Sequence, residues 1–518
     1  MGRRAAAGLL LVLVGGCRED VFRCDDESQC PDGGSCEASG FCSILDERCP
    51  SGRRYAPLSG ALSGECVSVE GTSTDVEGST ADSAHDSTST GDDPPSPATS
   101  SDASGGETST TGNEPLVFVD DDASDFGAGS PNATVFDDGL HLQPGSTAGT
   151  FVSRVFDAGQ PASWTALDWA PRAPYAKPLP DDGANDESYP EGNASMEANV
   201  LLLHFDIGVA LVPGDAVTES SGHAQPVTLE GMGSVGASPS AIFGEGIALT
   251  PSNSVSVDAS GTDDFQFGTD DFTWSMWART TSPCFEPEGT AAENQVYMGI
   301  EEGTTGGAHT WLGCYNPAST RCGPTDGDGR LGSTVTPAQG NNIGSLCGGD
   351  RELVDGAWHH LALVKRGHVD AALHLFFDGE LIESVEVAYT VPILFSDERP
   401  FQIGRLDDSY ASTVDLDEMA VFRRGLQPIE VADLHLRGAL RLEFRVRACD
   451  TPSCDGVPFA GPGGDIEATF LDGPDGPNVV LEPLHGRYFQ YEARFSRTTL
   501  LLAREPIVDE VRVTALAD

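Results

Sequence analysis

Short runs of β-branched and aromatic residues, separated by Gly, Asp and Pro, recur from Pro115 onward and constrain the fold more than any other feature. Runs of this kind are typical of β-strands bounded by turns. Only Leu426–Leu436 has the pattern of a helix, with Pro428 suited to a first helical position. The predicted fold class is therefore all-β, and so many antiparallel strands favour a two-sheet jelly roll.

The stretch Trp358–Leu381 holds four histidines and illustrates this pattern. Its apolar runs predict two strands, and the Asp-Gly pair at 378–379 favours a type I′ turn into a third. Because successive side chains of a strand point to opposite faces, His359 and His360 cannot converge on one ion. His360 and His374 are able to share a face, but no clear third zinc ligand lies nearby. We interpret these rings as packed at a sheet surface, with a metal or acid–base site as the alternative.

The first residues predict export. Arg3 and Arg4 precede the apolar segment Ala5–Val14, which is too short to span a bilayer as a mature helix. The sequence from Val14 to Cys17, "VGGC", resembles a bacterial lipobox, whose cysteine is acylated and becomes the first residue after cleavage. We predict a lipoprotein signal peptide at 1–16, a lipid on Cys17 and a position in the cell envelope, preferably the outer membrane or cell surface. The alternative is an ordinary signal peptide with an incidental cysteine.

The cysteines also suit an oxidising compartment. Thirteen minus Cys17 leaves twelve, an even number, in three local groups that are each even. Six of them predict a small disulfide-held module at 17–67; a zinc cluster is the rival, but the spacing contains no CxxC pair. The connectivity stays open. The predicted disulfide cysteines are Cys24, Cys30, Cys36, Cys42, Cys49 and Cys66, then Cys284, Cys314, Cys322 and Cys347, then Cys449 and Cys454.

The charge restricts the partners. With 81 acidic and 29 basic residues, the net charge is −52, which repels the phosphates of nucleic acid and of anionic lipid. We therefore expect no nucleic acid, and contact with the membrane only through the N-terminal lipid. Residues 68–114 are rich in Ser, Thr, Asp and Gly and lack the apolar side chains that offset the entropy of ordering, so they predict a disordered linker.

Eight segments in a fixed order resemble the LamG-like jelly-roll domains of the concanavalin A-like superfamily. They run from "LLLHFD", which ends at Asp206, to "VDLDEMAVFRRGLQPIEVADL" at 414–434, and include "DFTWSMWAR" and "DGAWHHLALV". The resemblance implies a jelly roll over 196–437. It departs at Thr281–Gly349, a Gly- and Cys-rich insertion that we expect to form disulfide-stapled loops over one sheet face.

The segments on either side of the jelly roll each offer about four strands. Neither half buries enough on its own for a stable sandwich. We therefore predict a second β-sandwich, made of 115–195 plus 438–518, into which the jelly roll is inserted. Two separate small domains beside the jelly roll are the alternative.

The superfamily includes sugar binders, adhesion modules, glycosidases and calcium sites, so the fold alone does not select a function. Concanavalin-like glycosidases carry Glu-x-Asp-x-(x)-Glu on one strand, and this run is missing from the sequence; Asp415–Met419, "DLDEM", looks like a structural turn. We expect a non-enzymatic, lipid-anchored binding or adhesion protein for an extracellular glycan or protein. A glycan-processing enzyme and a purely structural envelope protein are the alternatives.

Two pairs of residues are candidates for the site. The resemblance suggests that Asp206 and Asp417 meet where the first and last strands of the roll pair, and carboxylates of this kind suit calcium, the one possible cofactor. Trp311 and Tyr315, inside the insertion, are the candidates for an exposed platform that stacks on a sugar. Trp358, like the other tryptophans in family core strands, is expected to be buried.

Overall fold

The computed structural model divides into two compact units, residues 1–107 and 108–518. In the first unit, β1 (Ser35–Cys36), β2 (Cys42–Leu45) and β3 (Arg53–Tyr55) form one small antiparallel sheet. Cys17, the signal peptide and the linker at 68–113 lie outside the described residues. Those residues are 34–37, 42–45, 51, 53–55, 67, 114–186, 188–238, 240–284, 294–301, 308–316, 329–336, 344–349, 351–367, 371–387, 399–406, 410–472, 476–499 and 504–518.

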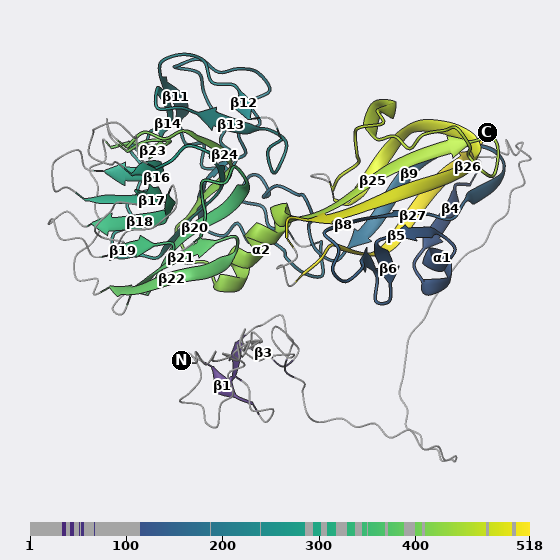
Figure 1. Cartoon of the computed structure of the whole chain (residues 1–518), viewed down its shortest axis with the longest axis horizontal. Coiled ribbons are helices and arrows are strands. Elements are labelled where there is room, and N and C mark those ends of the chain that lie inside the picture. Colours follow the sequence, from purple (N-terminus) through teal and green to yellow (C-terminus); the bar gives the residue numbers. More distant parts are fainter. Residues whose placement is uncertain are drawn as a thin grey trace, which may run out of the picture. The chain divides into compact units, whose positions relative to one another are not determined.

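The central part of the second unit is a two-sheet jelly roll (Figure 1). Its eight-stranded sheet has the order β12-β13-β24-β15-β20-β21-β22, with β10 also paired to β24. These strands are β10 (Asn199–Leu203), β12 (Ala237–Ser238), β13 (Gly246–Leu249), β15 (Phe272–Arg279), β20 (Trp358–Arg366), β21 (Ala371–Phe377), β22 (Glu380–Val387) and β24 (Val414–Phe422). The pairing of β10 with β24 confirms that the first and last strands of the roll are neighbours.

The facing sheet has seven strands in the order β11-β14-β23-β16-β17-β18-β19. They are β11 (Val227–Gly231), β14 (Asn253–Val257), β16 (Gln295–Glu301), β17 (His309–Tyr315), β18 (Arg330–Thr336), β19 (Gly344–Cys347) and β23 (Phe401–Ile403). Inward side chains of both sheets share one apolar core, which includes Phe272, Trp274, Leu312 and Phe401.

The expectation of stapled loops at Thr281–Gly349 is wrong for much of that segment. It supplies β16 to β19, which extend the seven-stranded sheet. Alternating apolar side chains in β17, "HTWLGCY", explain this, since Leu312 and Cys314 point into the core. Disulfides are present as expected: Cys284 is bonded to Cys314 and Cys449 to Cys454, and Cys36, Cys42 and Cys347 are also disulfide-bonded. Cys24, Cys30, Cys49, Cys66 and Cys322 lie outside the described residues.

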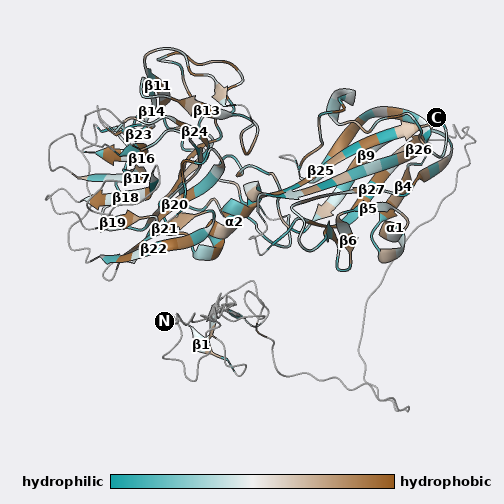
Figure 2. Cartoon of the chain, in the orientation of Figure 1, coloured by the Kyte–Doolittle hydropathy of each residue, from teal (hydrophilic) through white to brown (hydrophobic). Residues whose placement is uncertain are grey.

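The segments on either side of the jelly roll join in one nine-stranded sheet, which we call the host sheet. Its strands are β4 (Leu116–Asp120), β5 (Ser130–Asn132), β6 (Thr134–Phe136), β7 (Leu140–Leu142), β8 (Ala148–Val152), β9 (Phe156–Pro171), β25 (Leu440–Cys449), β26 (Asn478–Arg497) and β27 (Ile507–Ala517). β26 pairs with β8 and β9 from the N-terminal segment, so the two halves share backbone hydrogen bonds. Along β25, buried and part-buried residues alternate, and Figure 2 colours the strands of this sheet by hydropathy, with hydrophobic and hydrophilic residues interspersed. The buried set meets a core in which Trp164 stacks on Phe489 at 4.8 Å.

One helix connects the jelly roll to the host sheet. α2 (Pro428–Ala439) begins at Pro428, as expected, and Glu430 accepts a hydrogen bond from the Gln427 backbone N–H at 2.7 Å. β25 follows at the next residue. The other helix, α1 (Ala123–Gly127), is short and lies between β4 and β5 of the host. Within the described ranges, neither is long and apolar enough to cross a bilayer.

Buried charged groups lie where α2 meets the host. The Arg437 guanidinium donates to Asp186 at 2.6 Å and to the backbone oxygens of Lys177 and Pro178. The Lys177 ammonium donates to the Tyr189 hydroxyl, which donates to Asp472 at 2.5 Å. We call these five side chains, from Lys177, Asp186, Tyr189, Arg437 and Asp472, the junction network.

The shared host sheet predicts that the host folds without the jelly roll. Deleting Ala198–Gly438 and joining the flanks with a short Gly-Ser linker is expected to leave one cooperative thermal transition, because the β8–β26 and β9–β26 pairings remain. Circular dichroism and calorimetry measure this. If residues 115–180 fold when expressed alone, two separate domains replace the split host.

Candidate functional site

The outer face of the eight-stranded sheet carries side chains in register across three strands. Trp358 of β20, Arg279 of β15 and Asp415 of β24 are direct neighbours, and we call them row one. Two residues further along each strand, His360, Trp277 and Asp417 form row two. Since side chains alternate between faces, both rows point away from the core of the roll.

Beyond row two this face is apolar and covered. Phe376, Ala362 and Phe422 of the sheet pack against Val431 and Leu434 of α2, together with Leu179 and Met196 from the segment that enters the roll. This end of the sheet face is therefore covered by α2 and by the segment that leads from the host into the roll.

Row two is polar but buried. The His360 Nε2 is 2.9 Å from the Ser275 hydroxyl, and its ring lies edge-on to Trp277 at 5.4 Å. Burial, with His435 close by, lowers the pKa of His360 to about 3, so the ring is neutral. His435 of α2 also contacts Trp277, at 5.5 Å. These contacts favour the structural interpretation of the histidines.

His359 and His374 likewise have protein partners. Both ring nitrogens of His359 meet carboxylates, Asp378 at 3.0 Å and Asp355 at 3.2 Å. Asp378, with φ +52°, and Gly379 form the predicted hairpin turn. His374 meets the Ser384 hydroxyl at 3.0 Å.

The predicted cation ligands Asp206 and Asp417 meet the same turn, Ser240–Glu245. Asp417 Oδ2 accepts the Phe243 backbone N–H at 2.9 Å, and Asp206 Oδ1 accepts that of Glu245 at 2.7 Å. Gly244 between them has φ +49°, and a Cβ there would lie 2.2 Å from Asp206 Oδ1. The turn thus packs directly on the Asp206 carboxylate.

The electrostatics of Asp417 suit a positive neighbour. The residue is fully buried, and its Oδ1 has no hydrogen-bond partner among the described residues. Burial, and then the nearby Glu418, raise the pKa of Asp417 well above its usual range. Asp206 is exposed, so the pair offers one buried and one accessible carboxylate. Calcium takes six to eight oxygens, of which these acids would supply a part.

A different cluster brings three carboxylates close together. Asp121, Asp122 and Asp125 form the only group of three or more potential ligand side chains within 4.8 Å of one another in the described part of the chain. Asp122 caps α1 through its Oδ1, and Asp125 pairs with Arg154 at 3.3 Å. Asp122 and Asp125 therefore have structural partners, and the cluster alone indicates no ion.

Glu418 is occupied by structural contacts. It has φ +47°, and its carboxylate accepts from the Leu179 backbone N–H and meets His204 Nδ1 at 2.6 Å. The second His204 nitrogen lies 2.9 Å from Asp181. Burial disfavours a charged His204 ring, but the two carboxylates outweigh it and raise its pKa to about 9. A charged His204 therefore links β10 to the segment that enters the roll.

The expectation of an exposed platform at Trp311 and Tyr315 is wrong. Trp311 is 5% exposed and Tyr315 is 2% exposed. They lie on β17 and contact one another at 4.9 Å, and the Tyr315 hydroxyl is 2.6 Å from that of Thr334 on β18. Burial within the described residues removes the open ring face that sugar stacking needs.

The prediction that Trp358 is buried is also wrong, because its side chain is part-exposed. All six tryptophans lie in the described residues; five are at most 5% exposed, and Trp358 alone is part-exposed. It is the first residue of β20, directly after the turn at 355–357, and this position at a strand end was the available signal. Row one is thus the accessible end of the sheet face.

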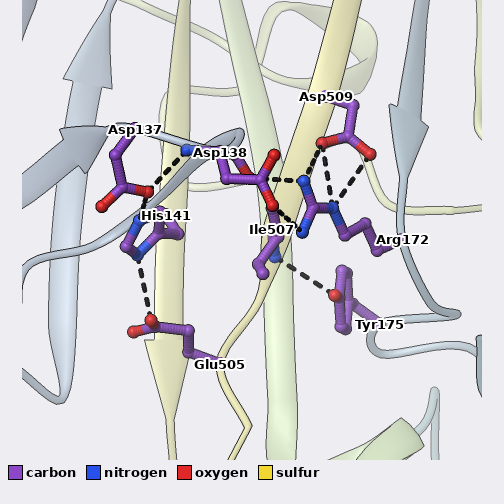
Figure 3. A network of polar contacts seen from close by, with 8 residues as sticks. All are labelled: Asp137, Asp138, His141, Arg172, Tyr175, Glu505, Ile507 and Asp509. Atoms are coloured by element: carbon purple, nitrogen blue, oxygen red, sulfur yellow. Dashed lines mark hydrogen bonds and ion pairs between the residues drawn. The ribbon is translucent and has the colours of Figure 1, made fainter. Parts of the chain in front are cut away.

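Figure 3 shows a second polar region, in the host. Arg172 binds Asp509 through two nitrogens at 2.9 to 3.1 Å, and Tyr175 accepts the Ile507 backbone N–H. His141 lies between Asp137 and Glu505, 2.9 Å from each. Beside this network is a hollow of about 200 Å³ between α2 and the host. It is smaller than typical ligand pockets, and the charges in Figure 3 are paired, so we assign the network a structural role.

Residues 252–432 match the family model of the concanavalin A-like lectin/glucanases superfamily, Laminin_G_3. The predicted LamG-like jelly roll is confirmed. No curated protein matches the sequence.

Solved structures resemble the chain at low identity. Domain 4 of AbnA, an extracellular arabinanase of family GH43 from Geobacillus stearothermophilus, in complex with arabinotriose, is 16% identical over 46% of this chain and 98% of that one, with a TM-score of 0.32. The binding domain of Paraclostridial Mosquitocidal Protein 1 has the same identity and TM-score over 46% of this chain and 52% of that one. The binding domain of botulinum neurotoxin DC in complex with SialylT is 12% identical over 56% and 70%, with a TM-score of 0.33. At these scores the likenesses carry no functional argument.

Proposed function

We propose that this chain is a cell-surface binding protein that recognises an extracellular glycan or protein through its jelly roll. The observation that carries the proposal is the accessible end of the eight-stranded sheet, where α2 stops and row one presents Trp358 beside a charged pair. An aromatic side chain next to a few fixed polar groups is the usual composition of a recognition site. The superfamily match over 252–432 supports it.

The acids of β24 favour binding over catalysis. A retaining glycosidase needs two carboxylates about 5 to 5.5 Å apart that face the same bond of the substrate. Here Asp415 is held by Arg279, Asp417 by the Phe243 backbone N–H, and Glu418 by His204. Each carboxylate has a different structural contact, and Asp417 and Glu418 are buried.

The test of this function is a screen of the full-length Cys17→Ser protein against immobilised glycans, in calcium and in EDTA. We expect selective binding to a small set of glycans, stronger in calcium. Failure to bind any glycan in either condition would exclude the glycan branch of the proposal, and capture of a defined surface protein would then be required to keep the protein branch.

We also propose that Asp206 and Asp417 hold calcium. The Oδ1 of Asp417, which has no hydrogen-bond partner in the part of the chain that the structure describes, and the shared turn support this. An ion that binds only the folded state stabilises it by RT ln(1 + [Ca]/Kd), about 2.7 kcal/mol at a hundredfold excess over Kd. Thermal melts of the full chain are therefore expected to show a rise of several degrees from EDTA to millimolar calcium.

Two variants locate the ion. Asp417→Asn keeps the shape but removes the charge, and should abolish the rise. Asp122→Asn, in the other acidic cluster, is the matched control and should retain it. An equal rise in wild type and Asp417→Asn would place the ion elsewhere, for example at the acidic stretch "DDGANDE" at 181–187.

The proposed attachment to the cell envelope rests on the lipobox-like sequence "VGGC" at 14–17. Cys17→Ser is expected to move the protein from the membrane fraction to the soluble fraction and to abolish incorporation of labelled palmitate. Wild type that incorporates no palmitate, together with a variant that still sediments with membranes, would contradict lipid anchoring.

A further inference from the structure

The position of the Trp358 ring is fixed by its neighbours. Its indole N–H donates to the Ser240 backbone oxygen at 2.9 Å, and the Arg279 guanidinium lies over the ring, 4.8 Å from its centre. The ring is nevertheless part-exposed. A fixed, accessible indole loses little conformational entropy on binding, which favours a contact with a flat apolar surface.

Arg279 and Asp415 place polar groups on the two strands next to Trp358. Asp415 Oδ2 accepts from Nε and Nη2 of Arg279, at 3.0 and 2.6 Å, and from the Ser238 hydroxyl at 3.0 Å. Every hydrogen bond that the described side chains make to Asp415 reaches this one oxygen. Oδ1 of the part-exposed carboxylate therefore keeps its capacity to accept hydrogen bonds from a ligand.

The charges favour a neutral ligand. Arg279 and Asp415 neutralise one another, and the exposed Asp206 at the neighbouring turn is acidic. The chain as a whole has a net charge of −52, which disfavours anionic glycans. A ligand suited to row one has an apolar face for the indole and hydroxyl donors for Asp415, but no negative charge.

We propose that row one is a subsite for a neutral pyranose, with the C–H face of the sugar against Trp358 and its hydroxyls donating to Asp415 Oδ1. This inference rests on the proposed function and specifies its glycan branch. The turn that receives the Trp358 N–H at Ser240 also bonds to Asp417 at Phe243 and to Asp206 at Glu245. We therefore expect sugar binding at row one and calcium binding at these two acids to be coupled through the turn at 240–245.

The experiment uses the full-length Cys17→Ser protein and four neutral hexasaccharides: cellohexaose, xylohexaose, mannohexaose and chitohexaose. Calorimetry gives the affinity, and tryptophan emission reports on contact. Trp358→Ala is expected to weaken binding of the best ligand roughly tenfold or more, as truncation of an anchoring aromatic does. Asp415→Asn should also weaken it, because one acceptor oxygen becomes a donor. Tyr488→Ala, a part-exposed aromatic of the host, is the matched control and should bind like the parent protein.

Trp358→Phe separates contact from a structural effect. It keeps an aromatic face, so binding should persist within several-fold. The ligand-induced change in tryptophan emission should disappear, because the five remaining tryptophans are buried. An emission change that survives in Trp358→Phe would contradict the subsite, even if Trp358→Ala does not fold.

The outcomes separate the two proposals. If the parent protein binds a glycan and Trp358→Ala binds it equally well, row one is not the subsite and the proposed function stands. If the screen against immobilised glycans finds only anionic ligands, the neutral class is wrong. If neither that screen nor the four hexasaccharides show binding, the glycan branch of the proposed function fails and the subsite fails with it.

Discussion

The Arg437 guanidinium is the group on which the arrangement of the second unit depends. It is 2% exposed, and it bonds to Asp186 and to two consecutive backbone oxygens of the segment that enters the jelly roll. A buried charge is tolerated only when it is paired, and loss of one partner of such a pair typically costs about 3–5 kcal/mol. Since Arg437 lies near the end of α2, its bonds hold the helix against residues 177–186, the segment that enters the jelly roll.

The position of α2 in turn determines which part of the sheet face is accessible. Val431 and Leu434 cover the apolar end, and His435 reaches the buried polar row. The helix ends at Ala439, which packs with Phe243 and Trp277 in a buried cluster that Trp358 borders, and β25 of the host follows. The helix and the turn at 240–245 thus cover the apolar and the buried polar part of this face and leave row one part-exposed.

The sequence was sufficient for features set by local chemistry. The Asp-Gly hairpin turn, the start of α2 at Pro428 and the pairing of the first and last strands all follow from turn residues, helix capping or the order of family segments. The period of two also places Trp358 and His360 on one face. Exposure was not predictable in this way. The sequence predicts burial for Trp358, but its side chain is part-exposed at the first position of β20, where it borders the cluster of Phe243, Trp277 and Ala439 and does not lie within it. The sequence predicts exposure for Trp311, which is buried because its segment forms a sheet strand.

The turn at Ser240–Glu245 connects the part-exposed row to the two acids. It accepts the Trp358 indole N–H at one end and donates to Asp417 and Asp206 at the other, so the exposed row and the acids share one short backbone segment. Burial makes a charged Asp417 costly, as the rise of its pKa shows. A proton or a bound cation relieves that cost, and both remove negative charge beside row one. The electrostatic requirement of the buried acid and the preference of the exposed row for a neutral ligand are therefore compatible.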